Sequence, residues 1–257
     1  MNEATPSQLA NSPWSASPST GTLPVALVTG AGRGIGRSVS LALGASGAHA
    51  VLMARTSKQL LAVQEEIHRN GGKATVLRGD VSLEEDVVAV FRRVRDELGH
   101  LDVLVNNAGT GLFGPLGTFA AADFDKVVAT NLRGTFLCSR EAMKIMTPQK
   151  SGYIINVSSV VGFKGYPNQA AYTASKHGIM GLTKSLAAEA HEHGIRVSAI
   201  LPGGVDTELI GDARPDLDRS ELLRPEDIAK VVMFLLSLPE RAAIDELYIR
   251  RRASRPF

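Results

Sequence analysis

Tyr172 and Lys176 are the residues whose types and spacing are best suited to chemistry in this sequence. Residues four apart share one face of a helix, so a helix here would place the lysine ammonium beside the phenol. A nearby positive charge favours the phenolate, and we therefore expect the pKa of Tyr172 to lie below its ordinary value of about 10. A phenol tuned in this way can pass a proton to or from a substrate oxygen.

Two more polar side chains are candidates for the same site. Ser159 follows the apolar run 154–157 and lies thirteen residues before Tyr172, and Asn131 lies in the run 130–134, Thr-Asn-Leu-Arg-Gly. A serine hydroxyl can hold a carbonyl oxygen on which charge develops. Each residue also has a purely structural explanation, since a serine pair after a strand often forms a turn and Asn131 can cap or kink its helix.

The segment 29–36, Thr-Gly-Ala-Gly-Arg-Gly-Ile-Gly, connects a predicted strand to a predicted helix. Backbone amides at such a helix start can hold a pyrophosphate. Gly30 allows the tight turn, Gly34 the approach of the phosphate, and Gly36 the packing of the helix on the sheet. The segment therefore predicts a dinucleotide site that includes Gly30, Arg33, Gly34, Ile35 and Gly36.

These motifs, with Asn-Asn-Ala-Gly at 106–109, together resemble the short-chain dehydrogenase/reductase family over about residues 24–249. The resemblance implies hydride transfer between a nicotinamide and a carbonyl carbon. In such enzymes Tyr172 would exchange the proton, Ser159 would hold the carbonyl oxygen and Lys176 would also bind the ribose. Asn131 would support a water path for protons towards the lysine.

The resemblance also implies contacts to the rest of the cofactor. Residues after the third strand would lie beside the adenine of the cofactor, and those after the fourth strand would line the cofactor cleft. The loop after the sixth strand would hold the nicotinamide carboxamide. Asn106 is as consistent with a structural role as with ligand binding, and Asp80 can alternatively cap nearby amides. The cofactor-binding residues implied in this way are Asp80, Val81, Asn107, Ala108, Gly109, Tyr172, Lys176, Pro202, Gly203, Val205 and Thr207.

The choice of cofactor is predicted from the end of the second strand. An acidic residue there would bind the ribose of NAD, but this chain has Arg55. A guanidinium can bind a 2′-phosphate through two parallel hydrogen bonds, and Arg33 in the glycine turn would supply a second cation. We therefore predict NADP(H) in preference to NAD(H), the alternative being two surface arginines without a ligand.

Short apolar runs alternate with segments of helical periodicity along most of the chain. This order predicts an α/β fold: a single Rossmann-type doubly wound parallel sheet of about seven strands with helices on both faces. Ser82 and Glu85 have the spacing of a capping box, and the polar stretch 208–224 suits a mobile flap. The predicted strands are 25–29, 48–53, 74–77, 101–105, 153–157, 196–200 and 247–249, and the main helices 34–44, 57–69, 83–98, 123–146 and 226–236.

Composition limits the remaining possibilities. The 257 residues predict a disordered leader at 1–22 and a single dinucleotide-binding catalytic domain at 23–257. A net charge of +2, from 28 basic and 26 acidic residues, argues against a nucleic-acid partner. We see no membrane-spanning run and no signal peptide, so we expect a cytoplasmic protein. His191 and His193 are too few for a metal site, and we predict no metal.

We therefore predict an NADP(H)-dependent oxidoreductase acting on a small carbonyl or alcohol, and a homo-oligomer, tetramer or dimer. Segments 170–176 and 224–229 resemble 3-oxoacyl-acyl-carrier-protein reductases, which favours an acyl-carrier thioester as substrate. The ending 247–252, Leu-Tyr-Ile-Arg-Arg-Arg, departs from the Val-Asp-Gly-Gly tail of such relatives and favours a broad-range small carbonyl or hydroxy-acid reductase. An NAD-linked polyol or steroid dehydrogenase and a non-catalytic NADPH-sensing regulator are further alternatives. The arginines themselves are most simply explained as a solvated chain end.

Overall fold

The computed structural model describes residues 22–213 and 218–255 of the chain. All but one residue of the predicted leader 1–22 lies outside this described part. The division of the chain into a leader and one catalytic domain stays a prediction.

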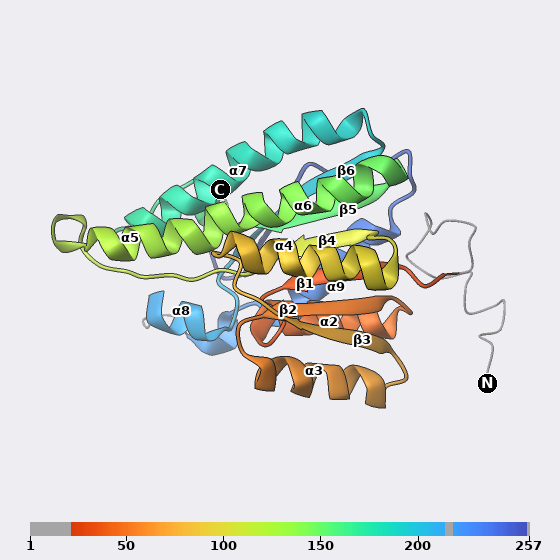
Figure 1. Cartoon of the computed structure of the whole chain (residues 1–257). Helices are drawn as coiled ribbons and strands as arrows, with labels where there is room; N and C mark the ends of the chain where they lie inside the picture. The colour runs from red at the N-terminus through yellow and green to blue at the C-terminus, as the bar shows by residue number, and fades with distance from the viewer. Residues whose placement is uncertain (1–21, 214–217, 256–257) are drawn as a thin grey trace.

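A seven-stranded parallel sheet forms the centre of the molecule, as predicted (Figure 1). Its order is β3-β2-β1-β4-β5-β6-β7, so the chain starts in the middle, winds outward, and returns across β1 to build the other half. The crossing between β1 and β4 is the topological switch point at which ligands bind in such sheets. The strands are β1 (Val25–Thr29), β2 (His49–Ala54), β3 (Lys73–Arg78), β4 (Val103–Asn106), β5 (Gly152–Val157), β6 (Ile195–Gly203) and β7 (Glu246–Arg250).

Helices cover both faces of the sheet, because successive side chains of a strand point to opposite faces. In β1, Ala26 and Val28 pack with α2, α3 and α9, whereas Val25 and Leu27 pack with α4, α6 and α7. Figure 1 shows the two helical layers on either side of the strands. The helices are α2 (Gly34–Ala45), α3 (Ser57–Arg69), α4 (Glu84–Arg93), α5 (Ala121–Val128), α6 (Gly134–Gln149), α7 (Ala170–His191), α8 (Glu208–Ala213) and α9 (Pro225–Ser237).

The helix predicted at 123–146 is interrupted by a wider turn. A π-helical turn, Ala129–Arg133, joins α5 to α6. Asn131 lies in it and is fully buried. Such turns often occur at functional sites. The stretch predicted as an irregular flap contains α8 and a 3₁₀ turn, Arg219–Glu221, so that prediction was wrong for these residues.

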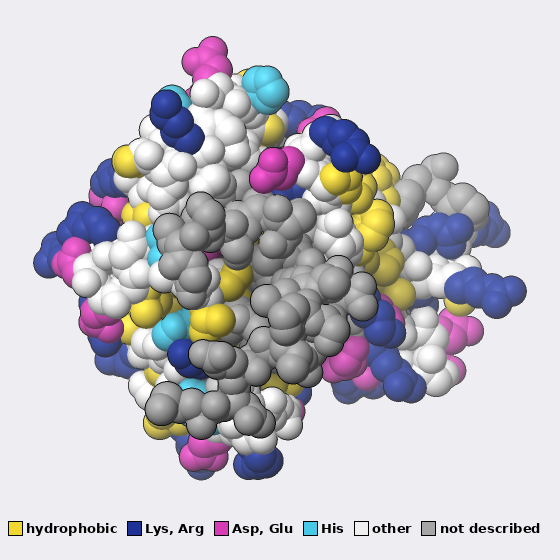
Figure 2. Space-filling model, turned by 90° about the vertical axis from the view of Figure 1, so that its right-hand side faces the viewer, with side chains coloured by type: hydrophobic (Ala, Val, Ile, Leu, Met, Phe, Trp, Pro, Cys, Tyr) yellow, Lys and Arg dark blue, Asp and Glu magenta, His cyan; other side chains and the backbone are white. Residues whose placement is uncertain are grey.

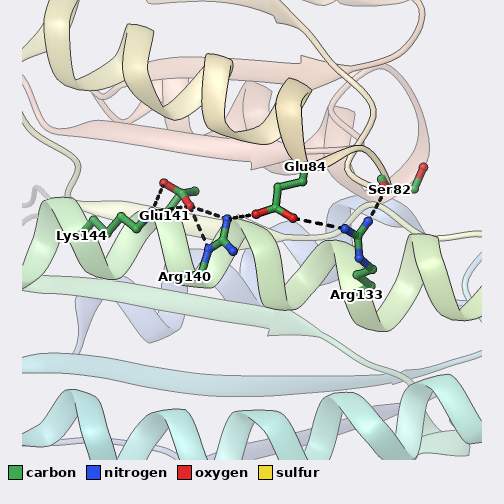
Figure 3. A network of polar contacts seen from close by, with 6 residues as sticks. All are labelled: Ser82, Glu84, Arg133, Arg140, Glu141 and Lys144. Atoms are coloured by element: carbon green, nitrogen blue, oxygen red, sulfur yellow. Dashed lines mark hydrogen bonds and ion pairs between the residues drawn. The ribbon is translucent and has the colours of Figure 1, made fainter.

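The capping box predicted at Ser82 and Glu85 is also wrong. Helix α4 begins at Glu84, and the Ser82 hydroxyl donates instead to the Asp80 carboxylate at 2.7 Å. The carboxylate of Glu84 lies between Arg133 and Arg140, at 3.3 and 2.8 Å (Figure 3). Tertiary ion pairs therefore join the start of α4 to the α6 region.

The network in Figure 3 continues along α6 to a buried carboxylate. Glu141 accepts hydrogen bonds from Arg140 and Lys144, each at 2.9 Å or less. Burial acts to raise the pKa of Glu141, but the two cations outweigh it and hold the pKa below its ordinary value. A charge this buried is tolerated because both partners are present.

Figure 2 shows the end of the molecule opposite α8, where basic and acidic side chains of the described residues lie interspersed. This arrangement fits the near balance of charge in the sequence. Among the helices of the described ranges, none is long and apolar enough to cross a membrane.

A buried polar chain ties the centre of the sheet to α6 and α7. Asn156 of β5 accepts a hydrogen bond from Asn106 and donates one to Thr183, both at 2.9 Å. Asn106 also donates to Ser139 at 3.0 Å. The open question about Asn106 is thus answered in favour of a structural position, since its amide nitrogen faces the core.

The substitution Asn156→Ala should lower the free energy of unfolding by about 1–3 kcal/mol, because it leaves buried partners on Asn106 and Thr183 unsatisfied. Urea unfolding followed by circular dichroism measures this change. Ser185→Ala, at an exposed position of α7, is the control and should change stability by less than about 0.5 kcal/mol. If the two variants were equally stable, the predicted contribution of these buried hydrogen bonds to stability would be wrong.

Candidate functional site

A cavity of about 730 Å³ opens at the carboxyl ends of the strands. Residues that follow each of the seven strands contribute to its wall, which is the expected consequence of parallel strands ending at one edge. The size lies in the range of small-molecule and cofactor clefts. This cavity brings together residues that lie more than 200 positions apart, from Gly30 to Ser254.

The glycine turn forms one side of the cavity. Gly30 and Gly34 have φ angles of +66° and +53°, which favour glycine, and both line the cavity. A Cβ on Gly36 would lie only 2.2 Å from the Gly30 carbonyl oxygen, so only glycine lets α2 approach the turn this closely. The expected role of Gly36 in helix packing is therefore supported by the geometry.

The turn is held in place from β4. The Thr29 hydroxyl accepts hydrogen bonds from the amides of Asn107 and Ala108, both at 3.0 Å. In return, the Asn107 side chain donates to the Thr29 carbonyl oxygen at 2.9 Å. Asn107 thus lines the cavity, as predicted, while its amide group fixes the glycine turn.

Two arginines flank the end of the cavity near β2. Arg55 lies 3.7 Å from the Asp80 carboxylate, and its side chain remains 67% exposed, so it is accessible to a ligand. Arg33 forms an ion pair with Glu208 at the start of α8. The two cations predicted to choose the cofactor therefore lie at one end of the same cavity.

The opposite part of the cavity contains Ser159, Tyr172 and Lys176. Tyr172 is half-buried on α7, and its ring packs edge-to-face with that of Phe113, the two ring centroids lying 5.8 Å apart. Lys176 is buried one turn later, its Nζ atom 5.7 Å from the centre of the tyrosine ring. The Ser159 hydroxyl accepts from the Val161 amide at 3.3 Å and donates to the Pro202 carbonyl oxygen at 3.4 Å.

The expected low pKa of Tyr172 is wrong for this structure. Burial raises the pKa of Tyr172 to about 12, and a hydrogen bond with Ser159 offsets only part of the rise. The Lys176 Nζ donates to the Val157 carbonyl oxygen at 2.9 Å, and burial lowers the pKa of this amine to about 8. At neutral pH Tyr172 is thus a protonated phenol that can donate a proton.

Asn131 does not line the cavity but lies directly behind it. Its side-chain oxygen accepts from the Thr110 amide at 2.8 Å, and its nitrogen donates to the Thr110 carbonyl oxygen at 2.9 Å and to Ser175 at 3.0 Å. Asn131 therefore connects the loop after β4 to α7, the helix of Tyr172. The proton-relay role stays a prediction.

The structure brings nearly all the predicted residues to one cavity. Asn131 and Gly36 are the exceptions, and both support it from behind. The wall also contains residues that the sequence analysis did not assign to it: Asp206, Arg250, Arg251 and Ser254. A run of arginines at the chain end was visible in the sequence, but its closeness to the site was not, because it depends on β7 pairing with β6.

The residues fit a dinucleotide at one end and a carbonyl compound at the other. The glycine turn offers backbone close to the cavity without side chains, as a pyrophosphate requires. A hydroxyl, a phenol and an amine meet in the other part, as proton transfer to an oxygen requires. In the described ranges, no cluster of three His, Cys, Asp or Glu side chains is placed to hold a metal ion.

Buried Lys176 gives a testable dependence of stability on pH in the absence of nucleotide. Its pKa of about 8 lies below the ordinary 10.5, so between these values the folded state loses the proton that the unfolded state keeps. The free energy of unfolding of the wild type should therefore rise relative to Lys176→Met, by roughly 3 kcal/mol in total, as the pH increases across this interval.

Urea unfolding at several pH values between 7 and 10.5 measures the difference. Lys184→Met is the matched control, because Lys184 lies on the same helix with a side chain that is 70% exposed. Its curve should run parallel to that of the wild type. If the curve for Lys176→Met also ran parallel to that of the wild type, burial of the Lys176 ammonium would cost no free energy of folding.

Comparison with known proteins agrees with this geometry. The short chain dehydrogenase family model matches residues 24–218. A 3-oxoacyl-acyl-carrier-protein reductase of Synechocystis sp. is 40% identical over 229 residues, which are 87% of this chain and 93% of the relative. Levodione reductase of Leifsonia aquatica is 38% identical over 83% of this chain and 87% of the relative.

Two solved structures have the same fold. A metagenomic short-chain oxidoreductase in complex with NADP has a TM-score of 0.80 and 38% identity, covering 91% of this chain and 99% of the other. An alcohol dehydrogenase from Thermococcus sibiricus, complexed with 5-hydroxy-NADP, has a TM-score of 0.85 and 29% identity with the same coverage. The chain belongs to the short-chain dehydrogenase family of oxidoreductases.

Proposed function

We propose that this protein is an NADP(H)-dependent reductase of a carbonyl compound, with a 3-oxoacyl thioester as its preferred class of substrate. The observation that carries the proposal is one cavity that contains the glycine turn at one end and Ser159, Tyr172 and Lys176 at the other. The likeness to a 3-oxoacyl-acyl-carrier-protein reductase supports the substrate class.

The residues of the chain divide the work in this proposal. When bound, the nicotinamide supplies the hydride that the carbonyl carbon accepts. Ser159 donates a hydrogen bond to the carbonyl oxygen and holds it beside Tyr172. Tyr172 supplies the proton that this oxygen takes up, since its raised pKa keeps the phenol protonated near neutral pH. Lys176 binds the ribose, and Asn131 holds α7 in position or relays protons towards the lysine.

The preference for NADP(H) is assigned to Arg55 and Arg33. Both are exposed arginines at the cavity end that the glycine turn forms, and a guanidinium suits the geometry of a phosphate. NADP or 5-hydroxy-NADP is present in two solved structures of the same fold. To bind a phosphate, Arg33 would have to leave Glu208, which would free the start of α8.

A smaller carbonyl substrate is the second candidate. The observation that favours it is the presence of Arg250 and Arg251 in the cavity wall, where the sequence departs from the tail of 3-oxoacyl reductases. Likeness to a levodione reductase is consistent with this alternative. We also propose that the protein acts in the cytoplasm as a homo-oligomer, tetramer or dimer, on the family resemblance.

Tyr172→Phe tests the function directly. Removing the proton donor should lower kcat for NADPH-dependent reduction of acetoacetyl-CoA by at least about a hundredfold, the usual contribution of general acid catalysis. The decrease in NADPH absorbance measures turnover, and titration calorimetry measures NADPH affinity, which should change little. Tyr248→Phe, outside the cavity wall, is the matched control and should keep wild-type turnover. Undiminished turnover in Tyr172→Phe would reject this tyrosine as the proton donor. A wild-type protein that binds NADPH but reduces no carbonyl compound would favour the alternative of a non-catalytic NADPH-sensing regulator.

Arg55→Ala tests the choice of cofactor. Because a charge-assisted hydrogen bond contributes about 1.5–3 kcal/mol, the Kd for NADPH should rise about tenfold or more, whereas that for NADH should barely change. Titration calorimetry gives both constants. Arg69→Ala, exposed at the end of α3, should leave both as in the wild type. An equal rise of both constants in Arg55→Ala would contradict a contact to the 2′-phosphate.

A further inference from the structure

The segment after β7 brings positive charge to the substrate part of the cavity. Arg250 and Arg251 line the wall, and Arg250 pairs in the sheet with Gly203 at the end of β6. A Cβ on Gly203 would lie 2.9 Å from Val160, the residue after Ser159, and 3.6 Å from the Cβ of Arg250. The arginines therefore lie beside the segment that carries the proposed carbonyl-binding serine, whereas Arg55 follows β2 on the other half of the sheet.

Arg250 holds the shape of this segment. Its guanidinium donates to the carbonyl oxygens of Arg251, Arg252 and Ser254, at 3.3, 3.4 and 2.5 Å. These three bonds, all from the Nη1 atom of Arg250, close a turn at the end of the strand. The consequence is a fixed position for the next residue, Arg251.

The backbone and the Cδ atom of Arg251 are held in place, while its guanidinium has no close partner among residues 22–213 and 218–255. Its amide donates to the Gly203 carbonyl oxygen at 3.4 Å, and a Cβ on Gly204 would lie 3.5 Å from its Cδ atom. The side chain is only 18% exposed. Within the described ranges no hydrogen bond leaves the guanidinium, and its ion-pair partner there, Glu221, is 3.8 Å away and 52% exposed. That distance is too long for a hydrogen bond, and exposed ion pairs contribute little.

The cavity-wall carboxylates that the structure describes have arginine partners other than Arg251. Among residues 22–211 and 218–255 three carboxylates line the wall, and each faces an arginine of its own: Glu208 faces Arg33, Asp80 faces Arg55 and Asp206 faces Arg219. In the described part of the chain this largely buried guanidinium has no acid closer than Glu221, which is unfavourable unless a ligand supplies an anion. The surplus positive charge thus lies on the side of the cavity that is assigned to the substrate.

We propose that Arg251 binds an oxyanion of the substrate, a carboxylate or a phosphate, and so makes the enzyme selective for negatively charged carbonyl compounds. A guanidinium presents paired donors in the geometry of both groups. The inference rests on the proposed function and deepens it. A short oxo acid would offer its carboxylate, and a carrier-bound 3-oxoacyl thioester would offer the phosphate of its pantetheine arm.

Steady-state kinetics of the full-length enzyme with NADPH test the proposal. Two substrate pairs differ in the anion: 5-oxohexanoate against its methyl ester, and acetoacetyl-CoA against the N-acetylcysteamine thioester of acetoacetate. In Arg251→Gln the KM of the anionic member of one pair should rise about tenfold, as expected for the loss of a charge-assisted hydrogen bond, while that of its neutral partner changes less than about twofold. The pair that responds identifies the source of the oxyanion.

Two further variants separate charge from structure. Arg251→Lys retains the charge and should recover most of the affinity for the anionic substrate. Arg252→Gln removes a neighbouring charge whose side chain is exposed and outside the cavity wall, and should behave as the wild type. Equal changes for charged and neutral substrates, or a rise in the KM for NADPH in place of the substrate, would overturn the proposal.

A binding measurement keeps this test independent of turnover. Titration calorimetry of the NADP⁺-saturated protein with 5-oxohexanoate and with coenzyme A should give, for at least one of them, a Kd about tenfold higher in Arg251→Gln than in the wild type. If no carbonyl compound is reduced but this difference appears, the proposed reaction fails and the anion site stands. If both ligands bind the wild type and Arg251→Gln equally, or bind neither, the anion site is rejected.

Discussion

The polar tie between the ends of β1 and β4 is the constraint on which the site depends. At this switch point the chain leaves β1 towards one half of the sheet and re-enters through β4 for the other, so a gap must open between the two strand ends. The Thr29 hydroxyl and the Asn107 side chain cross this gap and hold the glycine turn against the loop after β4. The positions of the glycine turn, α2 and the cavity wall relative to one another depend on these hydrogen bonds.

Burying the polar groups of the reactive part destabilises the protein, and the surrounding fold compensates for this loss. Lys176 is a buried amine with a lowered pKa, and Tyr172 is a phenol with a raised one, and burial is the main cause of both shifts. Backbone and side-chain partners hold them: Lys176 bonds to Val157, and Asn131 fixes α7 through Ser175. Polar groups that a stability-optimised core would exclude are thus positioned by neighbours with no contact to the reacting atoms.

Predictions from local patterns succeeded where a single element decides the outcome. The alternation of apolar runs and helical segments predicted a parallel doubly wound sheet, and all seven strands appear near the expected bounds. Predictions failed where distant groups compete for the same atoms. Ser82 did not cap α4, because its hydroxyl donates to the Asp80 carboxylate instead. Tyr172 did not acquire a low pKa, because burial raises the pKa and the hydrogen bond with Ser159 offsets only part of the rise.

The sequence by itself determined the fold class, the glycine turn and the identity of the groups that can do chemistry, since these follow from periodicity, backbone freedom and functional groups within short segments. Only the tertiary structure decided which solvent, charges and partners those groups meet. The arginines at the chain end illustrate the difference: as a sequence they are a basic tail, but pairing of β7 with β6 brings Arg251 to the cavity. Burial and electrostatics depend on neighbours far apart in the chain, and short-range patterns do not contain them.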